Sequence, residues 1–319
     1  MISAILDTAL QQGFLYALAI FGVVVSFRMM NFPDLTVDGS FTLGGAVLAK
    51  ILVANHSPWI AMPIVALSGF IAGSTTAFLN RKLGISKILS GILIMLILYS
   101  INLRIMGKAN ISLLRTPTFF SPFDESGPGS PLRIAVFFGI AVIFLLVLCY
   151  FATTRLGLFI RATGDNEFMV RTKGINTDWL FLIGIGLANA LVALCGALVV
   201  QNQGFADINM GLGLIITALA ALIIGESSIS VIVSLRRLLS PQKRNNNIYS
   251  KYKLMPWETF NEFFAALLGA FLYFLIIAIC LRLGLAPTDL KLATGILVII
   301  GIALRLKGPM VETYVRGKL

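Results

Sequence analysis

Two acidic residues follow a long apolar segment near the N-terminus, where carboxylates could bind a cation or carry a proton. Asp34 and Asp38 lie four residues apart, so on a helical turn they would share one face. Pro33 removes a backbone donor, and a continuous helix is not expected here. A carboxylate at the centre of a bilayer costs about 2.5–3.5 kcal/mol on insertion scales, which makes it a functional candidate. The alternative is a turn with both acids in water, or a helix N-cap at Asp38.

Other polar residues in or beside the apolar segments are candidates to line a solute path with these acids. The two carboxylates suit a cationic amine, and the amides offer neutral hydrogen bonds near the outer end of the membrane. The full candidate set for the path is Asn31, Asp34, Thr36, Asp38, Ser40, Asn189, Gln201, Asn202 and Gln203. No metal is expected, because His56 is the only histidine and the three cysteines are widely separated in apolar runs.

The second polar region is the segment 153–178, which separates two apolar runs. Thr163 or Asp165 can cap a short helix, and Glu167 in its first turn suits the positive helix end. Phe168 adds apolar surface, and Gly174 offers a stop. The segment therefore predicts a short cytoplasmic helix whose apolar tip fits a groove on a partner. The alternative is a solvated loop with one helical turn.

The composition of the chain shows which elements must position these residues. Of 319 residues, 58% are hydrophobic and 12% are charged, whereas soluble domains carry about 25% charged residues. Apolar runs of about 20 residues can cross a bilayer. They fall at 9–27, 57–79, 86–106, 132–152, 179–200, 209–225, 262–282 and 289–305, with a weaker piece at 41–54. We predict one all-α polytopic membrane domain over 1–319, with eight or nine transmembrane helices, nine being preferred, and one broken or short helix near 30–54.

The distribution of charge predicts the orientation of the chain. Basic residues concentrate in 153–178, in 226–261 and in the C-terminal tail, and these stretches alternate with less basic ones. Such loops face the cytoplasm by the positive-inside rule. The formal net charge of +11 is then explained by basic residues on the cytoplasmic side of the membrane, and no nucleic-acid partner is needed to explain it. The C-terminus is expected in the cytoplasm.

The motifs of these two polar regions resemble those of a known transporter family. The run Arg161-Ala-Thr-Gly-Asp-Asn-Glu, followed by Gly174-Ile-Asn, resembles the coupling loop of bacterial ABC-importer permeases of the branched-chain amino acid and ribose permease branch. The stretch 31–45 is similar to the segment after the first span in that branch, most closely in an uncharacterised subgroup of the tryptophan/tyrosine type. The order of spans agrees over nearly the whole chain apart from about 230–260.

The resemblance implies a permease in the bacterial cytoplasmic (inner) membrane that imports a small polar solute, such as an amino acid. Its partners would be a cytoplasmic ATPase, an extracytoplasmic solute-binding protein and a second permease copy. The chain lacks the P-loop pattern G-x-x-x-x-G-K-[ST], so the ATP site lies on another polypeptide and no cofactor or enzymatic activity is expected. The residues that the resemblance assigns to ATPase coupling are Arg161, Thr163, Gly164, Asp165, Asn166, Glu167, Phe168 and Gly174.

The segment 226–261 departs from the family pattern as a basic cytoplasmic insertion. Its apolar part, 229–239, precedes a basic part near 241–247, an order typical of a membrane-surface helix beside anionic lipids. An extra ATPase contact and a solvated insertion are the alternatives. For the whole chain, the alternative function is an ion- or proton-coupled secondary transporter that uses Asp34 and Asp38. An intramembrane enzyme or a scaffold subunit is less well supported.

Overall fold

The chain forms a bundle of long helices with one small sheet. The computed structural model describes residues 2–114, 116–121, 131–239 and 255–285, and residues 289, 292, 294–296 and 299. The described elements are α1 (Ile2–Val23), the π-helix η1 (Val24–Met29), α2 (Thr36–Val53), α3 (Pro58–Leu83), α4 (Lys87–Met106), β1 (Asn110–Ser112), α5 (Pro131–Thr153), α6 (Arg155–Asp165), α7 (Glu167–Thr172), α8 (Thr177–Gln203), β2 (Phe205–Asp207), α9 (Leu214–Leu239) and α11 (Met255–Arg282).

Seven of the described helical segments are long and apolar enough to cross a membrane. Six of them correspond to predicted runs, and the seventh is α2, which the weak piece 41–54 forms together with the polar residues before it. The run 209–225 differs from its prediction, because the helix there starts only at Leu214. Its apolar part, Leu214–Ile229, is shorter than the 18 residues that a candidate membrane span requires. Most of the run 289–305 lies outside the described residues.

The helix α8 occupies the centre of the bundle and is held there by close backbone contacts. Its membrane window is 83% buried, compared with 22% for α5. A Cβ atom added to Gly44 of α2 would lie 1.9 Å from the carbonyl oxygen of Ala193, and one on Gly196 would lie 2.0 Å from that of Phe41. Small residues let these backbones touch where lipid provides no hydrophobic drive for association.

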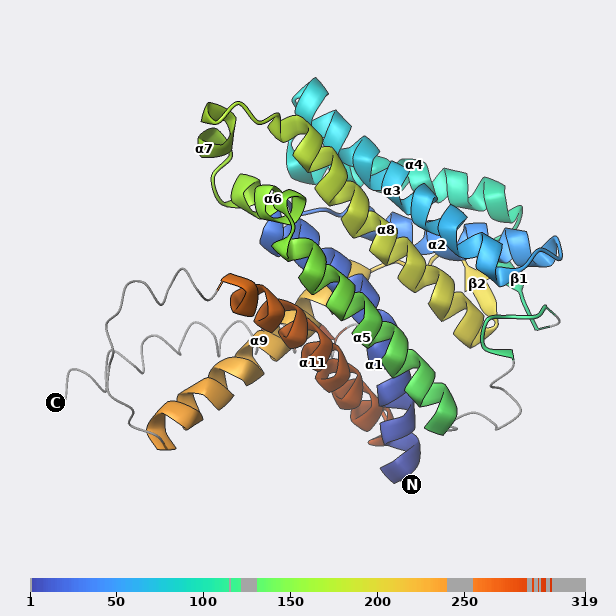
Figure 1. Cartoon of the computed structure of the whole chain (residues 1–319). Helices are drawn as coiled ribbons and strands as arrows, with labels where there is room; N and C mark the ends of the chain where they lie inside the picture. The colour runs from blue at the N-terminus through green and yellow to red at the C-terminus, as the bar shows by residue number, and fades with distance from the viewer. Residues whose placement is uncertain are drawn as a thin grey trace.

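The two ends of the bundle carry different structures (Figure 1). The helices α6 and α7 lie at one end, and the antiparallel pair β1–β2 lies at the other, with Ile111 opposite Ala206. After β2 the chain does not enter a helix at once. The irregular stretch 208–213 runs back along α2, where Gly211 lies against the carbonyl oxygen of Asp38. Irregular backbone at membrane depth is tolerated where protein or a cavity surrounds it.

The break after the first span is confirmed. The π-helix η1 ends at Met29, and Asn31 adopts a left-handed conformation with φ 48°. Lys87 Nζ, at the start of α4, donates to the carbonyl oxygen of Asn31 over 3.0 Å. The polar segment is therefore a folded connection between η1 and α2, fixed at the end of the bundle that carries α6 and α7.

The start of the predicted insertion belongs to a bundle helix. Residues 229–239, expected as a membrane-surface helix, form the C-terminal part of α9, which is continuous from Leu214 to Leu239. The apolar run simply extends the helical hydrogen-bond ladder of the preceding residues, so no separate helix begins there. The basic part, 240–254, lies outside the described residues.

Candidate functional site

The predicted coupling loop folds into two short helices, α6 and α7, with a sharp break between them. Asn166 is extended at φ −154° and its Oδ1 accepts from the backbone N–H of Met169 over 3.1 Å, so Asn166 is the N-cap of α7. The prediction of Thr163 or Asp165 as the cap is wrong. Thr163 lies within α6 and donates to the carbonyl oxygen of Phe159, and Asp165 is the last residue of α6. Gly174, at φ 77°, follows α7 as the predicted stop.

A network of ion pairs fastens α7 to the ends of two long helices. Arg81, at the end of α3, donates to both carboxylate oxygens of Glu167 and, through Nε, to Asp178 Oδ1 over 2.8 Å. Its guanidinium also lies 4.6 Å from the ring centroid of Phe181. Glu167 further accepts from Thr177 Oγ1 over 3.0 Å. Because Arg bonds to carboxylates through a rigid planar fork, the network fixes the position of α7 relative to α3 and α8.

The ionisation of Glu167 reflects this network. Its burial by itself would raise the pKa of the carboxyl group, but the hydrogen bonds from Arg81 and Thr177 and the charges of Arg81 and Arg171 outweigh it. The pKa of Glu167 is therefore lowered below its ordinary value. Glu167 thus stays ionised near neutral pH, as its pairing with Arg81 requires.

The other predicted coupling residues lie around this network. Phe168 and Met169 are 77% and 60% exposed, so α7 presents the predicted apolar tip. Gly164 packs against the end of η1, since a Cβ there would lie 2.0 Å from the carbonyl oxygen of Met29. Arg161 is turned the other way and donates to Thr259 and Glu262 of α11. The loop is thus bound to four neighbouring elements while its tip stays uncovered by described residues.

Three of the predicted path residues form a chain of hydrogen bonds in the bundle interior. Asn189 of α8 donates through Nδ2 to Asp34 Oδ2 over 2.6 Å, and its Oδ1 accepts from Ser40 Oγ over 2.7 Å. All three residues are fully buried. Thr36 extends the cluster, because its backbone N–H donates to Asp34 Oδ1 and its Oγ1 pairs with that of Thr76. The fold therefore brings these sequence-distant residues together, and their polar groups satisfy one another.

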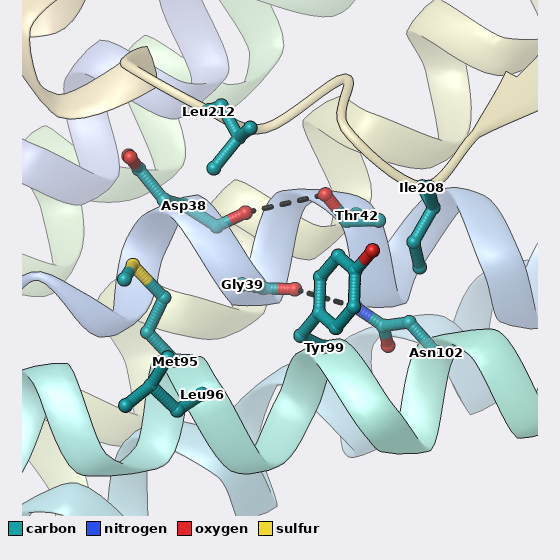
Figure 2. A pocket seen from close by; sticks show the side chains of 9 residues that line it. All are labelled: Asp38, Gly39, Thr42, Met95, Leu96, Tyr99, Asn102, Ile208 and Leu212. Atoms are coloured by element: carbon teal, nitrogen blue, oxygen red, sulfur yellow. Dashed lines mark hydrogen bonds between the residues drawn. The ribbon is translucent and has the colours of Figure 1, made fainter. Parts of the chain in front are cut away.

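Asp38 has a different environment from Asp34. Its carboxylate accepts from the backbone N–H groups of Gly213 and Ile215, each over 2.9 Å, and so caps the first turn of α9 across the bundle. Asp38 also lines a pocket between α2, α4 and the stretch 208–212 (Figure 2). The other residues lining this pocket are Gly39, Thr42, Met95, Leu96, Tyr99, Asn102, Ile208 and Leu212. The alternative of Asp38 as a helix N-cap is wrong for α2, because Asp38 lies in the first turn of that helix and its N-cap is Leu35; the carboxylate caps α9 instead.

The three amides at the end of α8, Gln201, Asn202 and Gln203, bind neighbouring segments at the end of the bundle that carries β1 and β2. Gln201 Oε1 accepts from the backbone N–H of Phe119 over 2.8 Å, and Asn202 accepts from Arg133 over 2.8 Å. Gln203 donates to the carbonyl oxygen of Phe205. These bonds join the end of α8 to Phe119 before α5, to Arg133 in the first turn of α5 and to β2. A role of the three amides in the solute path remains a prediction.

Sequence reasoning missed three residues of these sites. Arg81 and Asp178 are not singled out by the sequence, because the contacts of Arg81 with Glu167 and with Asp178 depend on the fold. Asn102 had a usable signal, since an amide inside the apolar run 86–106 needs a partner.

The fold and these sites define a polytopic membrane protein with a buried polar cluster inside an apolar bundle and an exposed apolar tip between two spans. The chain belongs to the family described as branched-chain amino acid transport system / permease component, whose model matches residues 5–235.

Individual relatives extend the likeness along the chain. A tyrosine transport system permease protein of Clostridioides difficile is 34% identical over 296 residues, covering 93% of this chain and 90% of the relative. An uncharacterized protein of Rickettsia prowazekii is 34% identical over 299 residues, covering 94% of this chain and 97% of the relative. A ribose import permease protein of Escherichia coli is 26% identical over 62% of this chain and 61% of its own length. No solved structure matches the chain.

These likenesses settle the class of function. The chain is a multi-pass transmembrane permease subunit for a small solute, and ATP hydrolysis belongs to a separate subunit. It is a transport subunit and not an enzyme. The family confirms the resemblance found in the sequence, and it disfavours the secondary-transporter alternative.

Proposed function

We propose that the chain imports an amino acid and that α7 is the helix through which an ATPase drives it. The observation that carries this proposal is the combination of an exposed apolar tip with a fixed base. Phe168 is 77% exposed, while the preceding residue, Glu167, is bound by Arg81 of α3 and Thr177 of α8. A partner that moves this tip would therefore move the ends of two long helices with it.

The solute class rests on the relatives. The tyrosine transport permease is similar over nearly the whole chain, whereas the ribose permease matches about three fifths of it. An aromatic amino acid is thus the first solute to test. Uptake of radiolabelled L-tyrosine by cells that produce the full transporter should exceed uptake by cells without this chain, and excess ribose should not compete. Competition by ribose in place of amino acids would contradict the proposal.

The assembly that supports this function has four further parts. We propose a second copy of the chain, an ATPase on each copy at the α6–α7 end, a solute-binding protein at the β1–β2 end, and lipid around the least buried helices, α3, α4 and α5. The α6–α7 end and the C-terminus would lie on the cytoplasmic side of a bacterial inner membrane, in agreement with the basic residues in 153–178.

Copurification tests the docking role of α7. Phe168→Asp places a charge on the apolar tip and should remove the ATPase from the purified complex, because a desolvated carboxylate in an apolar groove is costly. The control is Leu283→Asp, since Leu283 is 80% exposed and follows α11 at the end of that helix away from α6. An ATPase that remains bound to the Phe168 variant would overturn the coupling assignment.

A further inference from the structure

The long helices of the bundle form two groups (Figure 1). The helices α2, α3, α4 and α8 form the first packed group, and α1, α5, α9 and α11 form the second. The groups meet mainly along α1 and α8, where a Cβ atom on Gly22 would lie 2.5 Å from the carbonyl oxygen of Ala188. Because close-packed interiors resist rearrangement, a movement inside the chain is expected between the groups and not within them.

The α6–α7 loop is bound to both groups. Glu167 of α7 is held by Arg81 of α3, in the first group. Arg161 of α6 donates through Nη1 to Thr259 Oγ1 over 2.6 Å and through Nη2 to Glu262 Oε1 over 3.1 Å, both on α11 of the second group. Although α6 also packs against α8, its described side chains form hydrogen bonds with no long helix except α11.

The ion pair of α6 leads into a connected part of the second group. The side chain of Arg161 is 18% exposed and that of Glu262 is 30% exposed, so the pair escapes part of the solvent screening that weakens surface ion pairs. From α11 the contact continues into α9, because a Cβ atom on Gly225 would lie 1.9 Å from a backbone carbonyl oxygen of α11. Glu226, the next residue, pairs with Arg28 of η1. A displacement of α11 therefore carries α9 and η1 with it.

The contact between α2 and the start of α9 forms a seam between the two groups. The stretch before α9 is bound to α2, since the Gly211 N–H donates to Thr42 Oγ1 over 3.2 Å. Gly213 follows at φ 87°, a conformation that glycine adopts at little cost, and α9 begins at Leu214. Asp38 of α2 accepts from the first turn of α9 across this seam. A movement of α9 together with α11 changes the seam.

We propose that Arg161 and Glu262 are positioning residues that transmit the movement of the ATPase from α6 to the second group, while α7 moves the first. The proposal rests on the proposed function, because an ATPase must supply the movement. A loop attached to one group would only carry that group along. This loop is attached to both, with extended backbone at Asn166 between α6 and α7, so a displacement of its tip changes the angle between the groups.

Charge reversal separates transmission from docking. Glu262→Arg places two guanidinium groups together, so the complex should keep its ATPase and still hydrolyse ATP, while L-tyrosine uptake falls at least about fivefold, within the usual range of coupling between sites. The double variant Arg161→Glu/Glu262→Arg restores an opposite pair and should recover most of the uptake. Arg155→Glu is the matched control, since Arg155 is exposed on the same helix and its side chain has no hydrogen bond or ion pair with a described residue.

A cysteine beside the seam reports the transmission without any solute. Leu212 is 52% exposed and lines the pocket next to the seam. In proteoliposomes of the ATPase-bound complex, the rate at which N-ethylmaleimide modifies Leu212→Cys should differ at least about fivefold between the nucleotide-free and ATP-bound states. The difference should disappear when Glu262→Arg is added and return with the double variant. The chain without the added cysteine measures the background from the native cysteines.

The outcomes distinguish this inference from the proposed function. A wild-type chain that purifies without an ATPase would contradict the proposed function, and a wild type that takes up no L-tyrosine would contradict its solute, while the rates at position 212 still decide the role of the pair. At equal amounts of protein in the membrane, the inference is overturned if Glu262→Arg loses less than about twofold of the uptake. Loss of the ATPase from that variant, or no recovery in the double variant, would overturn it as well.

Discussion

At the scale of single residues, the two acids after the first span have separate roles. Asp34 is fully buried and bound by Asn189 and Thr36, whereas Asp38 lines a pocket and caps α9. Burial raises the pKa of Asp34 and the hydrogen bonds from Asn189 and Thr36 lower it, with burial prevailing. Their spacing of four residues suggested one shared site, but the break before α2 places Asp34 on the connection and Asp38 on the helix.

The Asp34–Asn189–Ser40 cluster predicts a large stability effect at one position. Asn189→Leu removes the amide that both neighbours use, so the buried Asp34 Oδ2 and Ser40 Oγ lose their hydrogen bonds while Thr36 still donates to Asp34 Oδ1. We expect a loss of about 2–3 kcal/mol in the free energy of unfolding, measured by denaturant titration in detergent. Asn209→Leu, at an exposed position, is the control. Equal stability of the two variants would show that the cluster does not hold α2 and α8 together.

At the scale of elements, the crossing of α2 and α8 depends on direct backbone contact. Gly196→Leu would force the helices apart, because even a Cβ atom there lies 2.0 Å from the carbonyl oxygen of Phe41. We expect a loss of at least about 3 kcal/mol, at the upper end for overpacking. Gly139→Leu in α5 is the matched control, since no described atom lies within 4 Å of a Cβ there. Thermal unfolding in detergent that fails to separate the two variants would contradict the close crossing.

The attachment of α7 should depend on pH through Glu167. Its pKa is lowered in the folded protein because the bonds and charges of Arg81 outweigh burial, so its contribution is complete above the ordinary value of about 4.3. It is lost as pH falls through the lowered pKa. Thermal stability between pH 6 and pH 3 should therefore fall more for the wild type than for Glu167→Gln. Parallel pH curves would contradict the ion-pair network as a stabilising attachment.

At the scale of the whole molecule, burial is uneven in a way that favours a second copy. The membrane windows of α3, α4 and α5 are 33%, 28% and 22% buried, whereas that of α8 is 83% buried. We expect part of the less buried surface to face another copy and the rest to face lipid. Native mass spectrometry from a mild detergent should give particles with two chains of 34.5 kDa. A single chain per particle would contradict the proposed homodimer.

The sequence by itself determined that the protein is embedded in a membrane, and it determined most of the membrane spans. Apolar runs of membrane length and a charge content of 12% exclude a soluble protein, because a surface that faces water needs more charged residues. Local rules also placed the break at Pro33 and the stop at Gly174. The short helix α7 was predicted from the sequence motif, although its cap was assigned one or more residues too early.

The tertiary structure decided which distant residues meet. Nothing in the spacing joins Asp38 to Gly213, Asn189 to Asp34, or Arg81 to Glu167, because these contacts depend on how glycine-lined helices cross and on the return of 208–213 along α2. Asn102 is the clearest case. Its amide oxygen lacks a partner among the described residues only because of how α4 lies against α2, and that arrangement changes an unremarked residue of an apolar helix into the wall of a pocket.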